Sequence, residues 1–382
     1  MRIAVVGGGP AGLYLARLVK LHTPQHSVEV FEQNSPDATF GFGVGLGGTA
    51  RDRIRALDPL VHDRITAGMV FSDQQRIHLN GSDILVKYSS KGGAIGRLDL
   101  LHILQAACAE VGVTMHHDFR IESLEQFGGF DLVVGSDGVN SVVRRLHGDA
   151  FGTQIYNLTN HFAWYGVARA MKPSSLVFRT TPKGRFVGHY YGYTPSMSTF
   201  VAECDAQTWA CAGLGDMTDD ARRKYMEEIF APELDGDRLI DNRSIWRNFP
   251  VIVNARWSSG KSVLIGDALL SAHFSIGSGT RLAMDDAMAL FAAIQQTSDV
   301  PAALARFDEI RRPIRERFRL AAEKSFNWYE RLDQVMAQPP IDFVHDFLTR
   351  TGRIDDARLA EYAPGFAKLY AESRRAPAHA AG

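Results

Sequence analysis

The sequence is poor in cysteine and has no arrangement of cysteines that could bind a metal. Its three cysteines, Cys108, Cys204 and Cys211, form no CxxC pair and lack the spacing of metal ligands. Free thiols in a reducing compartment are therefore the expected state, because disulfides persist in oxidising surroundings. We expect no metal site.

The chain also lacks an excess of charge and a long apolar run. Lys and Arg number 42, Asp and Glu number 43, and the formal net charge is -1, so no general attraction draws it to nucleic acid or to an anionic membrane. The apolar N-terminus has no signal-peptide pattern, and glycines interrupt it where a membrane span would be continuous. We expect a cytoplasmic protein without a nucleic-acid or membrane partner.

What the sequence does contain is a dinucleotide-binding pattern at its start. The strand-like run "RIAVV" leads into GxGxxG, a helical stretch follows, and "SVEVFEQ" predicts a second strand that ends in Glu32. Gly7 permits the turn, Gly9 lets the backbone approach a pyrophosphate, and Gly12 allows close packing of helix on strand. The Glu32 carboxylate is placed to accept hydrogen bonds from an adenosine ribose and would repel a 2′-phosphate. FAD or NAD fits this pattern.

The rest of the chain predicts a nucleotide domain that is interrupted by a second sheet. Asn80-Gly81 separates two strand-like runs, as in a hairpin. Aromatic-rich runs between residues 153 and 205 alternate like antiparallel strands, and the chain is mostly helical from residue 281 onward. The expected division is a discontinuous nucleotide domain (1–75, 92–152 and 245–300), a sheet-based substrate domain (76–91 and 153–244) and a C-terminal helical region (301–382).

Three segments in this order resemble the class A, single-component flavoprotein monooxygenases. They are the GxGxxG with Glu32, then "SDGVNSVVRR", then "VLIGDALLSAHFSIGSGTRLAMDDAMAL". "FGFGV", "STFVAE" and "HFSIGSGT" look like the branch that contains salicylyl-CoA 5-hydroxylase, anthraniloyl-CoA monooxygenase and the tryptophan-derived pigment hydroxylase of violacein biosynthesis. The resemblance implies an α/β protein of the p-hydroxybenzoate hydroxylase fold, with a Rossmann-like FAD-binding domain, an inserted antiparallel β-sheet substrate domain and C-terminal helices.

The resemblance also implies an activity. Bound FAD would take electrons from NADH or NADPH, O2 would form a flavin C4a-hydroperoxide, and one oxygen atom would pass to an electron-rich ring. The substrate would be like salicylate, anthranilate or indole, either free or as a CoA thioester, and the enzyme a monomer or homodimer. A flavin-dependent dehydrogenase or reductase without oxygen transfer, and a flavin redox sensor without turnover, stay open as alternatives.

Several residues match the cofactor-binding motifs of that family. Asp137 and Gly138 belong to the DG motif near the FAD pyrophosphate, Asp267 corresponds to the ribityl contact, and Arg97 resembles an arginine near the same part of the flavin. Each aspartate could instead be an ordinary turn or cap residue. The cofactor-binding residues expected on these grounds are Gly7, Gly9, Ala11, Gly12, Glu32, Gly43, Val44, Arg97, Asp137, Gly138, Asp267, Gly277, Gly279 and Thr280, the last three at a helix start that can stabilise negative charge on the flavin.

A second run of glycines also satisfies GxGxxG, through Gly43, Gly45 and Gly48. No β-branched strand leads into it and no strand-ending acid follows about 20 residues later, so we interpret the spacing as a coincidence and expect one bound dinucleotide. By resemblance, Gly41, Gly43 and Val44 lie in a mobile segment along the isoalloxazine ring.

Candidates for contact with the substrate lie on two segments. His189 is the first candidate for a catalytic polar contact, and Tyr191 shares its strand face by the period of two. His273 is the second catalytic candidate, and Phe274 would pack on substrate or flavin. Each of these could equally be structural. The arginines of "EIRRPIRERFRL" (309–320) could contact CoA phosphates or could simply be solvated.

Overall fold

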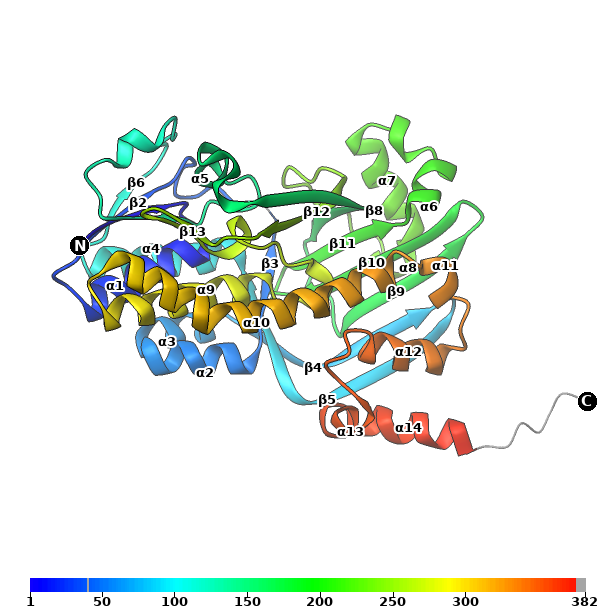
Figure 1. Ribbon diagram of the computed structural model, residues 1–382. Coiled ribbons are helices and arrows are strands. Elements are labelled where there is room, and N and C mark those ends of the chain that lie inside the picture. Colours follow the sequence, from blue (N-terminus) through cyan, green and yellow to red (C-terminus); the bar gives the residue numbers. More distant parts are fainter. Residues whose placement is uncertain (40, 376–382) are drawn as a thin grey trace, which may run out of the picture.

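Two β-sheets form the centre of the molecule in this computed structural model, which describes residues 1–39 and 41–375 (Figure 1). The first sheet has six strands in the order β13-β14-β7-β1-β2-β6. Its strands pair in parallel, except for the antiparallel pair β13 and β14. The strand bounds are β1 (Arg2–Val6), β2 (Ser27–Phe31), β6 (Thr114–His116), β7 (Leu132–Gly135), β13 (Ser258–Ser259) and β14 (Ser262–Leu264).

The order of strand, glycine turn, helix and strand predicted for the first 32 residues is confirmed. Apolar β1 is buried between β2 and β7, and α1 (Pro10–His22) follows the turn. A Cβ at Gly12 would lie 2.2 Å from the Gly7 carbonyl oxygen, so only glycine lets the helix approach the strand this closely. This close packing fixes where the helix N-terminus lies at the sheet edge.

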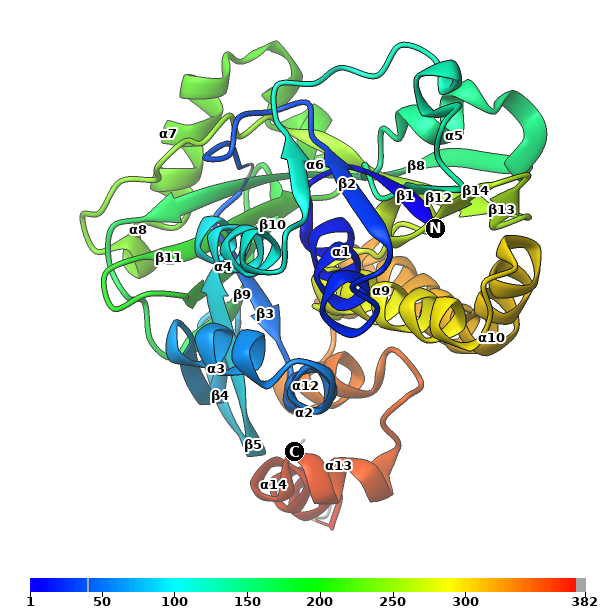
Figure 2. The same cartoon turned by 90° about the vertical axis from the view of Figure 1, so that its left-hand side faces the viewer.

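Helices cover the first sheet, and the contacts pair α1 with α4 and α9, and α9 with α10. Figure 2 shows α1, α9 and α10 in succession below this sheet. The helices and short 3₁₀ turns of this half are α2 (Gly48–Leu57), α3 (Pro59–Ala67), α4 (Arg97–Glu110), η1 (Leu124–Phe127), α5 (Val142–Leu146), η2 (Gly148–Phe151), η4 (Gly266–Ala268), η5 (Phe274–Ile276) and α9 (Gly279–Gln296).

The second sheet has eight strands in the order β12-β8-β11-β10-β9-β4-β5-β3. Its predicted hairpin turns at Asn80 and Gly81, both with positive φ (46° and 93°), as a two-residue turn of this kind requires. One face packs on α6 (Ala206–Cys211), η3 (Leu214–Asp216), α7 (Asp219–Ile229) and α8 (Ala231–Leu234). The strands are β3 (Gly43–Leu46), β4 (Val70–Leu79), β5 (Ser82–Gly96), β8 (Thr153–Val167), β9 (Ser174–Thr181), β10 (Gly184–Gly192), β11 (Ser198–Cys204) and β12 (Arg247–Asn254).

The second sheet begins earlier in the chain than the expected division placed it. Strand β3 and the first residues of β4 fall within 1–75, which we assigned to the nucleotide domain, yet both strands belong to the eight-stranded sheet. The glycine-rich segment pairs with β5 over Gly93–Gly96. Glycine has little intrinsic preference for strands, so the sequence pattern does not reveal a strand that forms through tertiary pairing.

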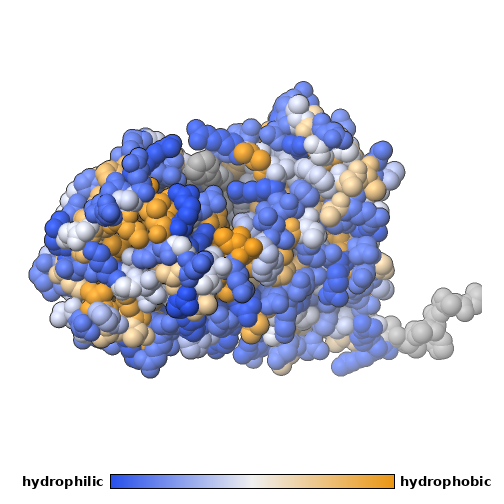
Figure 3. All heavy atoms as spheres, turned by 45° about the horizontal axis from the view of Figure 1, so that its top comes forward, coloured by the Kyte–Doolittle hydropathy of each residue, from blue (hydrophilic) through white to orange (hydrophobic). Residues whose placement is uncertain are grey.

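The C-terminal region is helical, as expected. Helix α10 (Val300–Tyr329) extends from the nucleotide-binding half to the second sheet (Figure 1), where Trp328 and Phe343 pack on Phe178 of β9. In the described residues, no helix is long and apolar enough to cross a membrane, and Figure 3 shows hydrophobic and hydrophilic residues interspersed on one face. The remaining helices are α11 (Leu332–Val335), α12 (Pro340–Thr349), α13 (Asp356–Tyr362) and α14 (Pro364–Arg375).

Candidate functional site

A cavity of about 2100 Å³ lies between the two sheets. Its lining comes from the start of α1, the end of β2, the loop after β7, the η4 turn and the start of α9, with β8, β10 and β12 opposite. A site for one small ligand typically measures about 300–1,000 Å³. This cavity is therefore large enough for an extended cofactor together with a second molecule.

One end of the cavity is suited to a pyrophosphate and a ribose. Gly7 has φ +103°, and a Cβ at Gly9 would meet nothing within 4 Å in the described part of the chain. Helix α1 has no side-chain cap there, so its backbone N–H groups and dipole face the cavity. Glu32 also lines the cavity and accepts a 2.7 Å hydrogen bond from the Gly8 backbone N–H, which fixes its carboxylate at the end of β2.

The DG segment after β7 presents an acceptor atom without a protein partner. Asp137 Oδ2 accepts hydrogen bonds from the backbone N–H groups of Val142 (2.6 Å) and Val143 (3.2 Å). Its Oδ1 is buried and has no partner among residues 1–39 and 41–375. Burial raises the pKa of Asp137. Because buried polar atoms are almost always hydrogen-bonded, this oxygen indicates a ligand donor.

Arg97 and Asp267 line the middle of the cavity with opposite charges. Burial lowers the pKa of Arg97, and its Nε has no hydrogen-bond partner within the described chain. Burial also raises the pKa of Asp267, against the effects of Arg315 and Arg97. Asp267 follows Gly266, whose φ of +62° provides the turn out of β14. Arg97 can donate a hydrogen bond to a polar group of a ligand, and Asp267 can accept one.

The start of α9 forms the next part of the wall. Gly277 has φ +56°, and the helix begins at Gly279 with Ser278 as a cap residue that makes no side-chain cap bond. Gly277, Gly279 and Thr280 all line the cavity. The N-terminal end of this helix therefore places partial positive charge at the cavity wall, where it can stabilise an anionic group.

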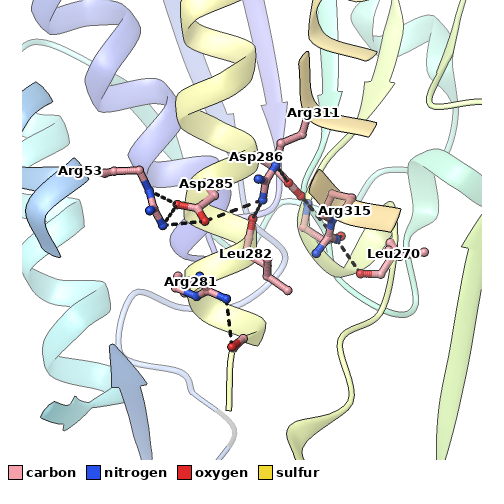
Figure 4. A network of polar contacts seen from close by, with 10 residues as sticks. Arg53, Leu270, Arg281, Leu282, Asp285, Asp286, Arg311 and Arg315 are labelled. Atoms are coloured by element: carbon pink, nitrogen blue, oxygen red, sulfur yellow. Dashed lines mark hydrogen bonds and ion pairs between the residues drawn. The ribbon is translucent and has the colours of Figure 1, made fainter. Parts of the chain in front are cut away.

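A network of buried charges lies behind the Gly266 turn (Figure 4). Asp286 of α9 pairs with Arg311 (2.6 Å) and Arg315 (3.4 Å) of α10. Its neighbour Asp285 pairs with Arg53 of α2 (2.8 Å). Asp286, Arg311 and Arg315 are 0%, 4% and 1% exposed. Charges buried this deeply depend on one another, since removing one partner leaves another uncompensated.

This network holds the cofactor-facing turn by its backbone. Asp286 Oδ2 accepts from the Gly266 N–H (2.9 Å), and Arg315 Nη2 donates to the carbonyl oxygens of Gly266 (3.0 Å) and Leu270 (2.7 Å). The direction of the adjacent Asp267 is thereby set by charges on α9 and α10. The charged network is a positioning device for the cofactor site.

Aromatic side chains form the wall farther along the cavity. The Phe274 ring lies 4.7 Å from Phe162 and 5.7 Å from Trp164, measured between ring centroids. His189 and Tyr191 of β10 line the same cavity. The guanidinium of Arg247 lies 5.7 Å from the Phe162 ring centroid and 5.6 Å from that of Trp164. The result is an aromatic wall for a flat ring with few polar groups, an arrangement typical of small-molecule sites.

His189 and Tyr191 lie on one strand face, as predicted, but differ in their bonding. Burial, with the Arg350 cation adding to it, lowers the pKa of His189 to about 4, so its imidazole is neutral at pH 7 and able to accept a proton or hydrogen bond. Tyr191 donates to the Gly43 carbonyl oxygen (2.9 Å), and burial raises its pKa to about 12. The Gly43 N–H donates to Thr199 Oγ1 (2.8 Å). The Tyr191 hydroxyl thus ties β10 to β3.

His273, the second catalytic candidate, lies behind the cavity wall, unlike His189. Among the described residues it does not line the large cavity, and its ring packs against Phe249 (4.6 Å) and Phe274 (4.3 Å). Its Nδ1 accepts from the Ser275 N–H (3.2 Å) and so caps the η5 turn. Burial lowers the pKa of His273 to about 3. This geometry gives His273 a structural role in place of the expected contact with substrate.

Most arginines of the segment 309–320 form ion pairs within the protein, whereas the sequence had left contact with CoA phosphates or simple solvation open. Arg311 and Arg315 point inward to the buried network. Arg312 pairs with Asp308, and Arg319 pairs with acids on the same helix. These four arginines are paired within the protein, whereas the exposed Arg317 has no ion pair among the described residues. Contact with CoA phosphates is therefore not assigned to the paired arginines of this segment.

The sequence matches known proteins over most of its length. A family model described as an FAD binding domain matches residues 130–319. Salicyloyl-CoA 5-hydroxylase from Streptomyces sp is 37% identical, covering 92% of this chain and 70% of that protein. A 3-hydroxy-4-methyl-anthranilyl-[aryl-carrier protein] 5-monooxygenase from Streptosporangium sibiricum is 36% identical, covering 96% and 98%. The chain belongs to the class A FAD-dependent monooxygenases.

Two further comparisons agree with this family. Protodeoxyviolaceinate monooxygenase from Chromobacterium violaceum is 34% identical over 92% of this chain and 94% of that protein. The solved tetrameric form of 2-methyl-3-hydroxypyridine-5-carboxylic acid oxygenase has the same fold, with a TM-score of 0.70 at 18% identity, covering 94% and 95% of the two chains. The expected α/β fold is thus confirmed, and the protein is an FAD-dependent aromatic monooxygenase that uses NAD(P)H and O2.

The cavity of this monooxygenase fits FAD. The glycine turn and uncapped α1, the Glu32 carboxylate, the partnerless atoms of Asp137 and Arg97, and the start of α9 follow one another along its wall. We assign the adenosine and pyrophosphate to the first of these groups and the flavin to the last. When bound, FAD supplies the oxygen-activating chemistry with electrons from NAD(P)H.

Some residues of the site were missed by sequence reasoning. Asp285 and Asp286 fall within an apolar helical run, "RLAMDDAMAL", and acids on the buried side of such a helix are a signal for buried cations. Phe162 and Trp164 alternate along β8 on the cavity side, but the alternation alone does not distinguish a ligand pocket from a core. Thr199 carried no signal, because its contact with Gly43 joins strands far apart in sequence.

We predict that Asp286→Asn destabilises the protein and weakens FAD binding. The substitution leaves Arg311 and Arg315 without their buried counter-charge, which should cost about 3–5 kcal/mol in the free energy of unfolding. Denaturant unfolding and FAD titration of the apoprotein measure the two effects. Asp308→Asn, which breaks the more exposed pair with Arg312, should cost about 1 kcal/mol or less. Equal losses of stability and of FAD affinity in both variants would contradict the conclusion that the buried network holds the Gly266 turn.

We predict that Gly45→Val changes flavin reduction or coupling and leaves FAD bound. A Cβ at Gly45 would meet only the Gly93 carbonyl oxygen at 3.9 Å, so the new side chain fits on the cavity wall. Stopped-flow reduction, product yield per NAD(P)H and flavin content measure this. Gly7→Val is the contrast, because its Cβ would lie 2.8 Å from the Asp137 N and its φ is +103°. Selective loss of FAD in Gly45→Val would contradict the expectation that this glycine-rich segment affects the flavin ring without holding the cofactor.

Proposed function

We propose that this monooxygenase hydroxylates a phenol-like or aniline-like ring that packs against Phe274 and forms a hydrogen bond with His189. The observation that carries this proposal is the state of His189. Its imidazole lines the cavity and lies in register with Trp164, two strands away across β11. It is neutral at pH 7 and has no hydrogen bond to any residue in the part of the chain that the structure describes. A half-buried polar ring that lines a cavity without a protein partner is suited to a ligand donor.

The residues of the pocket have separate tasks in this reaction. Phe162, Trp164 and Phe274 exclude water and orient the ring toward the flavin end of the cavity. His189 accepts a hydrogen bond from the ring hydroxyl or amino group, which polarises that group so that electron density moves into the ring where oxygen is to be received. Tyr191 has no direct contact with the ring in this proposal, because its hydroxyl donates a hydrogen bond to the Gly43 carbonyl oxygen.

We further propose that the ring carries an acyl thioester. The cavity continues beyond the ring pocket along β4 and β5, past Gln75 and Tyr88, to the exposed Lys91 and Lys172. Such an arm can accept a long pantetheine-like chain, with the two lysines facing its phosphates. Two relatives act, by their names, on a CoA ester and on a carrier-protein substrate, which supports this alternative over a free acid.

The identity of the substrate class can be tested with a small panel. Salicylate, anthranilate, indole and the CoA thioesters of the two acids are compared for stimulated NAD(P)H consumption and for incorporation of labelled oxygen from O2. We expect the thioesters to give the higher kcat/KM, and Lys91→Ala with Lys172→Ala to raise their KM about tenfold, which corresponds to about 1.4 kcal/mol. Lys183→Ala, in the turn between β9 and β10, is the control. A preference for free acids contradicts the thioester proposal.

Replacement of His189 tests the polar contact with the ring. His189→Phe should lower the hydroxylation rate by about 10-fold to 100-fold, because one hydrogen bond to the reacting ring, about 1–3 kcal/mol, is lost, while FAD content is unchanged. His189→Gln keeps an acceptor and should lose less. His161→Gln is a matched control on β8, because His161 stacks on Trp209 outside the cavity. Normal hydroxylation by His189→Phe would contradict the proposed role.

A further inference from the structure

Arg350 follows α12 and lies beyond the residues matched by the FAD-binding family model. Its Nη2 donates to the Ser275 carbonyl oxygen (2.6 Å), its Nε to Ser325 Oγ (3.0 Å) and its Nη1 to the Phe347 carbonyl oxygen. The guanidinium also lies 4.0 Å from the Phe347 ring centroid and 5.8 Å from that of Tyr329. The C-terminal region thus reaches back to the turn beside the aromatic pocket.

The contacts of Arg350 form a continuous polar chain that ends at this turn. Ser325 Oγ bonds Ser275 Oγ (2.8 Å), and Ser275 Oγ bonds His273 Nδ1 (2.7 Å). Ser275 is the middle residue of η5 and directly follows Phe274, whose ring is part of the cavity wall. Fixing the Ser275 carbonyl therefore fixes the position of the Phe274 ring.

The charge of Arg350 is not neutralised by a hydrogen-bonded acid among the described residues. All three of its acceptors are neutral oxygens. The carboxylate that interacts with it electrostatically, Asp346, is itself bonded by Trp328 Nε1 (2.7 Å) and Gln338 Nε2 (3.0 Å). The positive charge of Arg350 therefore interacts with titratable groups that it does not contact, because the protein around it screens charge less than water does.

The titratable groups around Arg350 come from four helices and strands and from the residue that precedes η5. Burial is the main cause of the low pKa of His189 and of His273, and the Arg350 charge lowers both further. Burial lowers the pKa of Arg350 itself, while acidic neighbours act in the opposite direction. The groups that face it are His189 of β10, His273 before η5, Tyr88 of β5, Tyr329 of α10 and Asp346 of α12.

We propose that Arg350 is a positioning residue for hydroxylation, which holds the turn that carries Phe274 through its bonds to Ser275 and Ser325. The proposal rests on the proposed function only in that the substrate ring packs against Phe274. It assigns the C-terminal helices a part in the reaction through a residue, Arg350, that is not itself part of the cavity lining. Loss of the guanidinium should loosen the aromatic wall and let His189 gain a proton more easily.

Arg350→Met keeps the apolar stem and removes both the charge and the hydrogen bonds. Arg350→Lys keeps the charge with fewer directed bonds, and Ser325→Ala removes one bond while the charge stays. The control is Arg353→Met, which replaces an exposed arginine that lies over Phe318. Each variant is purified with FAD, and its imidazole signals are titrated by NMR, with the His189 signal assigned from His189→Gln. Product formed per NAD(P)H is measured from about pH 3.5 to pH 8, so that the range includes the pKa of His189.

In Arg350→Met we expect the pKa of His189 to rise toward its ordinary value of 6.5, and the acid limb of hydroxylation to move upward in pH by the same amount. Coupling should fall severalfold, with hydrogen peroxide released in place of product. Arg350→Lys should restore the titration of His189 and only part of the coupling. Ser325→Ala should lower coupling without changing the titration, and Arg353→Met should change neither.

An unchanged His189 titration and unchanged coupling in Arg350→Met with FAD bound would overturn the proposal. If this variant does not fold, Arg350→Lys and Ser325→Ala decide, and normal coupling in both would overturn it as well. The failure of the proposed function has a different signature. In that case His189→Phe hydroxylates normally, while Arg350→Met still shifts the NMR titration of His189.

Discussion

The functional site depends on the buried ion pairs that Asp286 makes with Arg311 and Arg315. These pairs join α9 to α10. Asp286 and Arg315 bond the N–H and the carbonyl oxygen of Gly266, while Arg311 bonds Asp286 and the Leu282 carbonyl oxygen. The turn that carries Asp267 is thus held from behind. A buried pair is not in itself a strong source of stability, and its value here lies in the single orientation that it enforces on the turn.

A second constraint comes from the two sheets that share the cavity. The parallel sheet brings helix N-termini and strand ends to one side, which suits phosphates and charge. The second sheet contributes Phe162, Trp164 and His189, which suit a flat organic ring. Charge recognition and ring recognition are thus supplied by separate layers, and the reactive part of the cofactor belongs at their boundary.

The sequence predicted the parts of the fold that depend on local pattern. The Gly7 turn, the first helix, the Asn80-Gly81 hairpin and the strands after residue 153 were all recognisable, because each has its own periodicity or turn chemistry. The strand β3 was not, since its glycines pair only because β5 lies beside them. The sequence also did not predict where the His273 ring points. Its motif was recognisable, but the direction of the ring is set by packing on Phe249, which lies 24 residues earlier in the chain. The roles of Arg315 and Arg350 depend on contacts with residues about 50 and 75 positions away, which no local pattern contains.

Helix α10 has a mechanical consequence for how this monooxygenase can move. Its 30 residues span about 45 Å at 1.5 Å per residue. One part of the helix is bonded to the Gly266 turn through Arg315, and the other packs on the second sheet through Trp328. A helix held at its middle and at its C-terminal end opposes hinge bending between the halves. Exchange of ligands with solvent is therefore expected to depend on smaller movements than a rotation of one half against the other.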